Sequence, residues 1–235
     1  MTGDATRPAL EVRDLYRFFR AGSEETLALR GVGFDVWPGE TVAVVGPSGS
    51  GKSTLLNCLA GLDEPAGGSV TVAGQPLTHR PEGERARIRS RSLGILLQSG
   101  NLVDHLSVRD NVALVVTKGE HRSPRRVATA LLGQVGLAKR ERALPRELSG
   151  GEAVRAGLAV ALANDPSVLI ADEPTGELDG DAERRVLDLL VARAADGGAV
   201  LLVTHSPQVI AIADRVLTLA DGVLADGVPA DGVAA

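Results

Sequence analysis

Aromatic residues are scarce in this sequence. Its 235 residues include only five, and all of them lie within the first 37 positions: Tyr16, Phe18, Phe19, Phe34 and Trp37. Proteins that read single-stranded nucleic acid stack bases on several aromatic side chains. The aromatic-free remainder of the chain argues against that class of protein. A purine ring that stacks on this chain is expected to do so near the N-terminus.

Cysteine, long apolar runs and excess basic charge are also lacking. The single cysteine, Cys58, excludes an internal disulfide, argues against a thiolate metal site and is expected to be a small buried apolar residue. No apolar run approaches the roughly 18 to 20 residues that cross a bilayer, and charged side chains near the start leave no apolar stretch for a signal peptide. The net charge of -5 argues against general nucleic-acid binding, so we expect no nucleic-acid partner.

The composition, 44% hydrophobic and 23% charged, is that of an ordinary globular protein with an aliphatic core. Near the N-terminus, residues 10–16 and 26–37 alternate apolar and polar side chains. This pattern predicts two strands of an N-terminal sheet, joined by a polar turn at 21–25. Phe34 and Trp37 lie in the second predicted strand and are expected in the core.

Further along the chain, short apolar runs alternate with helical patterns. Strands are predicted at 41–45, 93–97, 168–171, 199–204 and 216–219, and helices at 52–60, 107–117, 124–135, 150–163, 182–195 and 207–213. Buried strands that alternate with helices indicate a parallel α/β sheet. We interpret the whole chain, 1–235, as one domain, with an inserted helical subdomain at about 99–160 and a hairpin and tail at 220–235.

A glycine-rich segment follows the predicted strand 41–45 and opens a helix. It fits the phosphate-loop pattern G-x-x-x-x-G-K-[ST] and consists of Gly46, Pro47, Ser48, Gly49, Ser50, Gly51, Lys52 and Ser53, followed by Thr54. Glycines let backbone N–H groups surround phosphate oxygens, and the helix N-terminus adds partial positive charge. Lys52 can reach the β- and γ-phosphates, and the Ser53 hydroxyl can coordinate Mg²⁺. The segment predicts a site for nucleotide phosphates together with Mg²⁺.

An acidic pair ends the apolar strand 168–171. Neighbouring side chains of a strand point in opposite directions, so Asp172 can serve the Mg²⁺ shell while Glu173 faces an attacking water. Alone, such a pair is weak evidence for a site, because helix-capping charge explains it more readily. Together with the phosphate loop it predicts a hydrolytic site.

Three further segments resemble the ATP-binding subunit of an ABC transporter. They are Leu148 to Glu152 (Leu-Ser-Gly-Gly-Glu), Ala171 to Gly176 (Ala-Asp-Glu-Pro-Thr-Gly) and Val203 to His205 (Val-Thr-His). The resemblance extends from Leu10 to about Leu224. It implies an α/β phosphate-loop NTPase fold with a mainly parallel sheet, an N-terminal antiparallel β subdomain and an inserted α-helical subdomain.

The resemblance also implies a role for individual residues. Gln98 matches the glutamine that senses metal and water, and Asp172 and Ser53 complete the implied metal set. Glu173 matches the general base, His205 the histidine that contacts the γ-phosphate, and Phe19 the aromatic that stacks on adenine. Ser149, Gly150, Gly151 and Glu152 match the signature that contacts the nucleotide of the opposite subunit. Asp179 matches the loop that crosses the dimer interface.

Because one chain carries one set of motifs, the resemblance implies a dimer with a second copy or a paralogous ATPase subunit. It implies an integral membrane permease as partner and a cytoplasmic location, peripheral on the inner face of the cell membrane. The chain is similar to the branch that includes lipoprotein-release, macrolide-export and cell-division ATPases. This implies an ATP-hydrolysing motor for export or mechanotransmission, and the alternative is a regulatory or scaffold protein of a cell-division or envelope complex that does not transport.

The sequence departs from the family pattern after the signature. Many members have Gln-Gln-Arg where this chain has Ala153, Val154 and Arg155, and a common arginine is replaced by Val160. The departures put in doubt the usual polar contacts along that helix and leave the catalytic set intact.

Overall fold

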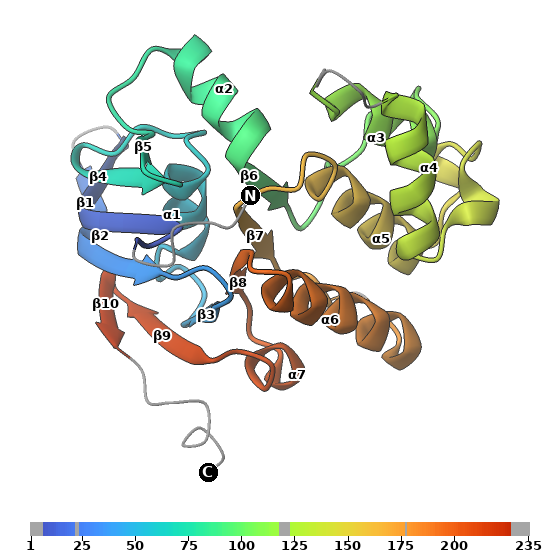
Figure 1. Ribbon diagram of the computed structural model, residues 1–235. Helices are drawn as coiled ribbons and strands as arrows, with labels where there is room; N and C mark the ends of the chain where they lie inside the picture. Colours follow the sequence, from blue (N-terminus) through green and yellow to red (C-terminus); the bar gives the residue numbers. More distant parts are fainter. Residues whose placement is uncertain (1–6, 22–23, 118–122, 177, 227–235) are drawn as a thin grey trace.

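The structure, a computed structural model, describes residues 7–21, 24–117, 123–176 and 178–226. They form two sheets and a group of helices (Figure 1). A four-stranded antiparallel sheet has the order β2-β1-β4-β5 and consists of β1 (Leu10–Ala21), β2 (Glu24–Val36), β4 (Gly67–Val72) and β5 (Gln75–Pro76). The predicted N-terminal sheet is therefore present, and it also contains β4 and β5, which the alternation did not single out.

The second sheet has six strands in the order β10-β9-β3-β8-β7-β6. They are β3 (Thr41–Val45), β6 (Leu93–Leu96), β7 (Val168–Asp172), β8 (Ala199–Val203), β9 (Arg215–Ala220) and β10 (Val223–Asp226). All neighbours pair in parallel except β10, which runs antiparallel to β9. Strands β3, β7 and β8 are continuous apolar runs because both of their faces are buried.

The α-helices are α1 (Lys52–Leu59), α2 (Glu82–Ser92), α3 (Val108–Val115), α4 (Pro124–Gln134), α5 (Gly150–Ala161), α6 (Gly180–Ala195) and α7 (Pro207–Ile210). Short 3₁₀ turns occur at Ala138–Arg140 and Pro145–Glu147. Helices α3, α4 and α5 stand together to one side of the large sheet (Figure 1) and share an apolar cluster of their own. Helix α5 also packs on β6, so it joins the helical group to the sheet.

The two sheets enclose the largest apolar cluster, which contains Phe34 and Cys58 as expected. Trp37 is different, because its side chain is 42% exposed. Strand β2 ends at the fully buried Val36, and the chain then turns, so the next side chain leaves the core. The expectation that Trp37 is a core residue was wrong.

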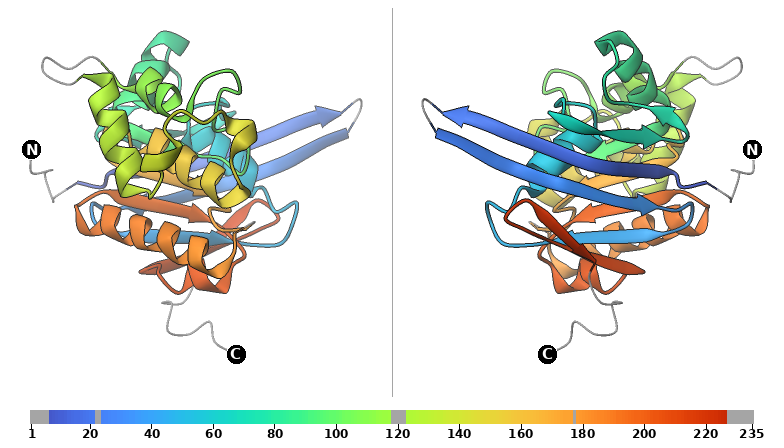
Figure 2. Two further views of the ribbon diagram at one scale, coloured as in Figure 1. Left: turned by 90° about the vertical axis from the view of Figure 1, so that its right-hand side faces the viewer. Right: turned by 90° about the vertical axis from the view of Figure 1, so that its left-hand side faces the viewer.

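Strands β1 and β2 form a longer hairpin than expected, and Figure 2 shows it projecting beyond the body of the molecule. Most of the predicted turn at 21–25 is in fact strand, since β1 runs to Ala21 and β2 begins at Glu24. Near the far end of this hairpin, Phe18 pairs with Leu27 and Phe19 with Thr26. At the other end of the chain, β9 and β10 form a hairpin, and the predicted tail after 226 lies outside the described residues.

Candidate nucleotide site

The phosphate loop connects β3 to α1 and can be built only with glycine at two places. Gly46 and Gly51 both have positive φ, at 156° and 105°. A Cβ at Gly46 would overlap the backbone oxygen of Leu219, and one at Gly51 would overlap that of Ala28. The loop is therefore packed directly against the end of β9 and against β2. A backbone held this closely presents its N–H groups in a fixed arrangement.

The loop carries hydrogen-bond donors that suit an anion. The N–H groups of the first turn of α1, from Lys52 to Thr54, have no intrahelical acceptor, and no side chain among the described residues caps this helix start. The Lys52 ammonium lies across the loop and donates to the carbonyls of Gly46 (2.8 Å) and Pro47 (2.9 Å). The Ser50 hydroxyl is buried without a hydrogen-bond partner in the described part of the chain. Orphaned donors, a helix N-terminus and an ammonium group fit a polyphosphate.

The residues around the loop also fit Mg²⁺ bound together with that polyphosphate. The described residues contain no group of three or more histidine, cysteine or acidic side chains that could hold a metal by themselves. Mg²⁺ is commonly held by one or two protein oxygens, phosphate oxygens and water. The exposed Ser53 hydroxyl and the half-buried Asp172 are such protein oxygens. Burial raises the pKa of Asp172, as does the neighbouring Glu173, while Lys52 lowers it.

Glu173 and His205 meet at the ends of β7 and β8. Oε1 of Glu173 lies 2.6 Å from Nδ1 of His205, and Oε2 accepts from the Thr204 hydroxyl at 3.2 Å. Glu173 lies just past β7 with a φ of 45°, uncommon for a residue other than glycine. The direction of its carboxylate therefore comes from this left-handed turn and its hydrogen bonds, and the strand alternation that we invoked does not apply to it.

Neighbouring strands of the parallel sheet bring these residues to one edge. The phosphate loop follows β3, His205 follows β8, Asp172 ends β7 and Gln98 comes shortly after β6, and these strands are consecutive in the sheet. Ligands of open α/β sheets bind outside the carboxyl ends of the strands. Gln98 is exposed there, on a turn held by Asn101, a residue that sequence reasoning missed.

The signature residues form a second, separate part of the site. Ser149 and Glu152 begin α5 with a capping box, in which the Ser149 hydroxyl accepts from the Glu152 N–H and the Glu152 carboxylate accepts from the Ser149 N–H. The Ser149 backbone N–H lowers the pKa of Glu152, and Arg140 lowers it further. Because the Ser149 oxygen is used as an acceptor, its own O–H remains able to donate to a ligand.

A cavity of about 580 Å³ opens beside this helix start. It is lined by all four signature residues, by Asp179 and Arg155, and by further residues of α6. Asp179 caps α6 by accepting from the Ala182 N–H at 2.9 Å. No phosphate-loop residue is among the described residues that line this cavity. One chain therefore presents two partial sites.

Phe19 is exposed near the far end of the β1–β2 hairpin. Its ring lies 4.8 Å from the guanidinium carbon of Arg17, which is ion-paired with Asp63. Phe18 is exposed to a similar extent, and neighbouring strand residues face opposite sides. The cation–π contact distinguishes the Phe19 side from the Phe18 side.

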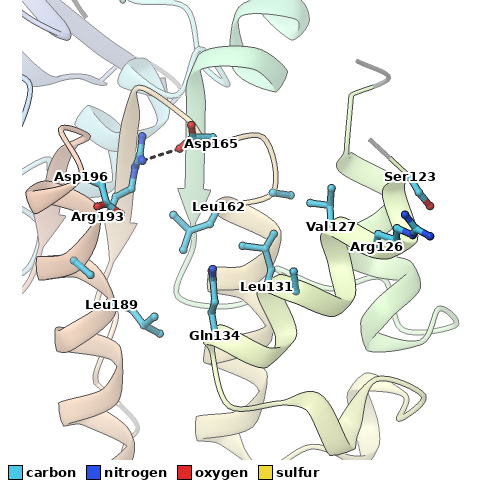
Figure 3. A pocket seen from close by; sticks show the side chains of 13 residues that line it. Ser123, Arg126, Val127, Leu131, Gln134, Leu162, Asp165, Leu189, Arg193 and Asp196 are labelled. Carbon is cyan, nitrogen blue, oxygen red and sulfur yellow. Dashed lines mark hydrogen bonds and ion pairs between the residues drawn. The ribbon is translucent and has the colours of Figure 1, made fainter. Parts of the chain in front are cut away.

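A larger groove, of about 700 Å³, separates α4 from α6 (Figure 3). Apolar side chains such as Leu131 and Leu189 line it, and the ion pair of Arg193 with Asp165 crosses one end at 2.7 Å. It includes none of the predicted site residues. The larger of the two cavities therefore does not coincide with the predicted site.

The fold and this edge of the sheet define a phosphate-loop nucleotide-binding protein. Residues 29–176 match the family model described as "ABC transporter". The chain belongs to the ABC transporter family, as one of its ATP-binding cassettes. This confirms both the predicted family and the predicted fold class.

The relatives are ABC ATP-binding proteins. An ABC transporter ATP-binding protein of Mycobacterium tuberculosis is 41% identical over 221 residues, which are 93% of this chain and 89% of the relative. The lipoprotein-releasing system ATP-binding protein LolD of Pseudomonas fluorescens is 42% identical over 92% of this chain and 96% of its own length. The macrolide export ATP-binding/permease protein MacB of Escherichia coli is 41% identical, and the match covers 34% of its length.

A solved structure has the same fold. The ATP-binding cassette MJ0796, described as a dimeric post-hydrolysis state bound to ADP and Pi, matches with a TM-score of 0.86 and 31% identity. The match covers 92% of this chain and 98% of that chain.

Proposed function

We propose that this chain is the ATP-hydrolysing motor subunit of an ABC transporter, acting as a nucleotide-sandwich dimer on a separately encoded membrane permease. One observation carries the proposal. The phosphate loop and the signature cavity are separate in the chain, and each offers hydrogen-bond donors from a helix start. A second copy, or a paralogous subunit, placed head to tail brings the signature of one chain to the phosphate loop of the other. The dimeric state of MJ0796 supports this arrangement.

In this proposal the residues of the loop bind and orient ATP. The first-turn N–H groups of α1 and the Lys52 ammonium hold the β- and γ-phosphates, and Phe19 stacks on the adenine. Ser53, Asp172 and Gln98 hold Mg²⁺, which neutralises developing charge on the phosphates when bound. From the partner chain, the residues Ser149 to Glu152 donate to the γ-phosphate, and Asp179 lies at the interface.

Glu173 is the proposed general base. Its carboxylate is fixed by the Thr204 hydroxyl and by His205, so it can accept a proton from a water placed for attack. His205 then contacts the γ-phosphate through the rest of its exposed ring. Phosphoryl transfer needs positioning and charge stabilisation more than covalent help, and these residues supply both.

Hydrolysis is tested with the purified chain. We expect turnover of ATP that requires Mg²⁺, and we expect Glu173→Gln to lose turnover while retaining a nucleotide-bound dimer in size-exclusion chromatography with light scattering. Wild-type turnover that survives this substitution would contradict the assignment of the base.

The permease and the export or mechanotransmission role are further parts of the proposal. None of the helices in the described ranges is long and apolar enough to cross a bilayer. LolD is named as part of a lipoprotein-releasing system, and MacB joins an ATP-binding part to a permease in one chain. We therefore propose that this chain lies on the cytoplasmic face of the cell membrane, bound to such a permease.

Co-purification from detergent extracts separates the two functional alternatives. A multi-spanning permease whose substrate stimulates hydrolysis supports the transport motor. A cell-division or wall-hydrolase partner without a transported substrate would identify a regulatory or scaffold protein instead.

A further inference from the structure

Asn101 closes the turn that carries Gln98. Its Oδ1 accepts from the Leu97 N–H at 2.8 Å, and its Nδ2 donates to the Leu97 carbonyl at 2.6 Å. The amide oxygen and the amide nitrogen of Asn101 are thus both hydrogen-bonded to the backbone of Leu97, in the way that a neighbouring strand would pair with it. The enclosed turn consists of Gln98, Ser99 and Gly100, and Gly100 has a φ of +77°. The path of the backbone at Gln98 is therefore defined by the side chain of Asn101.

Helix α5 provides the surface on which Asn101 rests. A Cβ added to Gly157 would lie 2.9 Å from the Asn101 Cβ and 3.0 Å from Leu96 Cδ1. Gly157 lies inside α5, where glycine is less favourable than alanine, so its lack of a side chain needs a packing reason. Gly133, inside α4, has no heavy atom within 4 Å of such a Cβ among the described residues. Gly157 therefore faces a close neighbour on another element, whereas Gly133 faces open space among the described residues.

We propose that Asn101 is a positioning residue for Gln98 and that Gly157 is the site on α5 that receives it. Helix α5 begins at the signature, so the Gln98 turn and the signature helix are packed as one unit. A shift of α5 would move Asn101 and, through both Leu97 hydrogen bonds, the Gln98 backbone. A contact at the signature of one chain can therefore change the position of Gln98 in the same chain, through helix α5 and Asn101. This inference rests on the proposed ATPase function.

The first test is a double-mutant cycle on ATP turnover. Loss of two hydrogen bonds of ordinary strength corresponds to roughly a tenfold change. We expect Asn101→Ala and Gly157→Ala each to lower kcat by about this factor while KM for ATP changes less than about twofold, since the phosphate loop is untouched. In a Gln98→Ala background, neither substitution should lower kcat further. An equal loss in that background, or wild-type kcat in the single variants, overturns the inference.

Amide hydrogen exchange gives a readout that does not depend on turnover. Asn101→Ala and Gly157→Ala should both speed exchange at Leu97 and Gln98, whereas the matched control Gly133→Ala should leave exchange and kcat as in the wild type. If Asn101→Ala does not fold, Asn101→Asp replaces it, because a carboxylate still accepts from Leu97 but donates nothing to its carbonyl. Unchanged exchange at Leu97 in the folded variants overturns the inference.

The two proposals fail in different ways. A wild type that hydrolyses ATP, and loses this activity with Glu173→Gln, supports the proposed function even if Asn101→Ala behaves as wild type. That result would overturn the positioning role alone. A wild type that does not hydrolyse ATP overturns both.

Discussion

Nδ1 of His205 lies 2.6 Å from Oε1 of Glu173, between the ends of two neighbouring strands. An ionised carboxylate only accepts hydrogen bonds, so this contact fixes the proton on Nδ1 and leaves Nε2 as the free ring nitrogen. The two side chains differ in exposure, since 14% of Glu173 and 80% of His205 are accessible. The pair thus joins a sheltered carboxylate to a ring that can reach a ligand.

His205→Ala is expected to lower kcat by about a hundredfold, within the range that general-base catalysis contributes, because the carboxylate of Glu173 loses the Nδ1–H that orients it. ATP affinity should change much less, because the phosphate loop and Lys52 remain. Steady-state hydrolysis and equilibrium nucleotide binding check the two quantities. His105→Ala, which changes an exposed histidine away from this pair, is the control. Equal kcat in both variants would show that His205 has no part in turnover.

Asp179 has a structural role and a proposed functional role, and one substitution separates them. Asp179→Ser keeps a side-chain oxygen for the Ala182 N–H, whereas Asp179→Ala loses the cap of α6 at a cost of about 0.5–2 kcal/mol. We expect the serine variant to keep wild-type stability in urea unfolding but to lose ATP-induced dimerisation and turnover. Normal activity of Asp179→Ser would limit Asp179 to capping.

Phe19→Ala is expected to weaken ATP binding by about 1–3 kcal/mol, the contribution of base stacking elsewhere. Phe18→Ala is the matched control, since both rings are exposed at neighbouring positions of β1 and the cation–π contact of Arg17 is with the Phe19 ring. Fluorescent-nucleotide displacement measures both variants. If Phe18→Ala weakens binding while Phe19→Ala does not, the assignment is off by one residue.

Cys58 should make stability depend on alkaline pH. Burial raises the pKa of its thiol to about 12. The folded chain therefore keeps a proton that the unfolded chain releases above its ordinary pKa, so stability falls as pH rises from about 8.5 towards that value. The slope from one such group is about 1.4 kcal/mol per pH unit. Urea unfolding between about pH 9 and 10 should show this slope reduced in Cys58→Ala. Identical slopes would mean that the thiol ionises equally in both states.

The sequence predicted the parallel sheet because each of its strands is an apolar run bounded by turn residues. It missed β4, although Val70 and Val72 alternate with polar residues, since only these two of its six residues, GGSVTV, are large and apolar. Trp37 was misplaced because hydrophobicity alone does not reveal where a strand ends. The residue pattern of one β-strand indicates which of its side chains are buried, but it does not indicate which other strands pair with it to complete the sheet.

The site shows the same limit. Motif spacing predicted the phosphate loop, the acidic pair and the signature. The left-handed turn at Glu173 and the amide of Asn101 depend on contacts with residues distant in the chain or on another element, and no local pattern reports those. The departures Val154 and Val160, which raised doubt as lost polar contacts, pack against two different apolar clusters. The helix gains apolar packing where polar side chains are usual.

The exposed side chain of Trp37 determines the intrinsic tryptophan fluorescence of this protein. It is the only tryptophan in the chain and is already 42% exposed when folded. Its emission should shift little on unfolding, so circular dichroism is the better measure of stability. Because the Trp37 signal is nearly constant, the fluorescence of a second tryptophan can be measured against it. Phe19→Trp would place this second fluorophore at the proposed adenine contact, and nucleotide binding could then be followed without a labelled ligand.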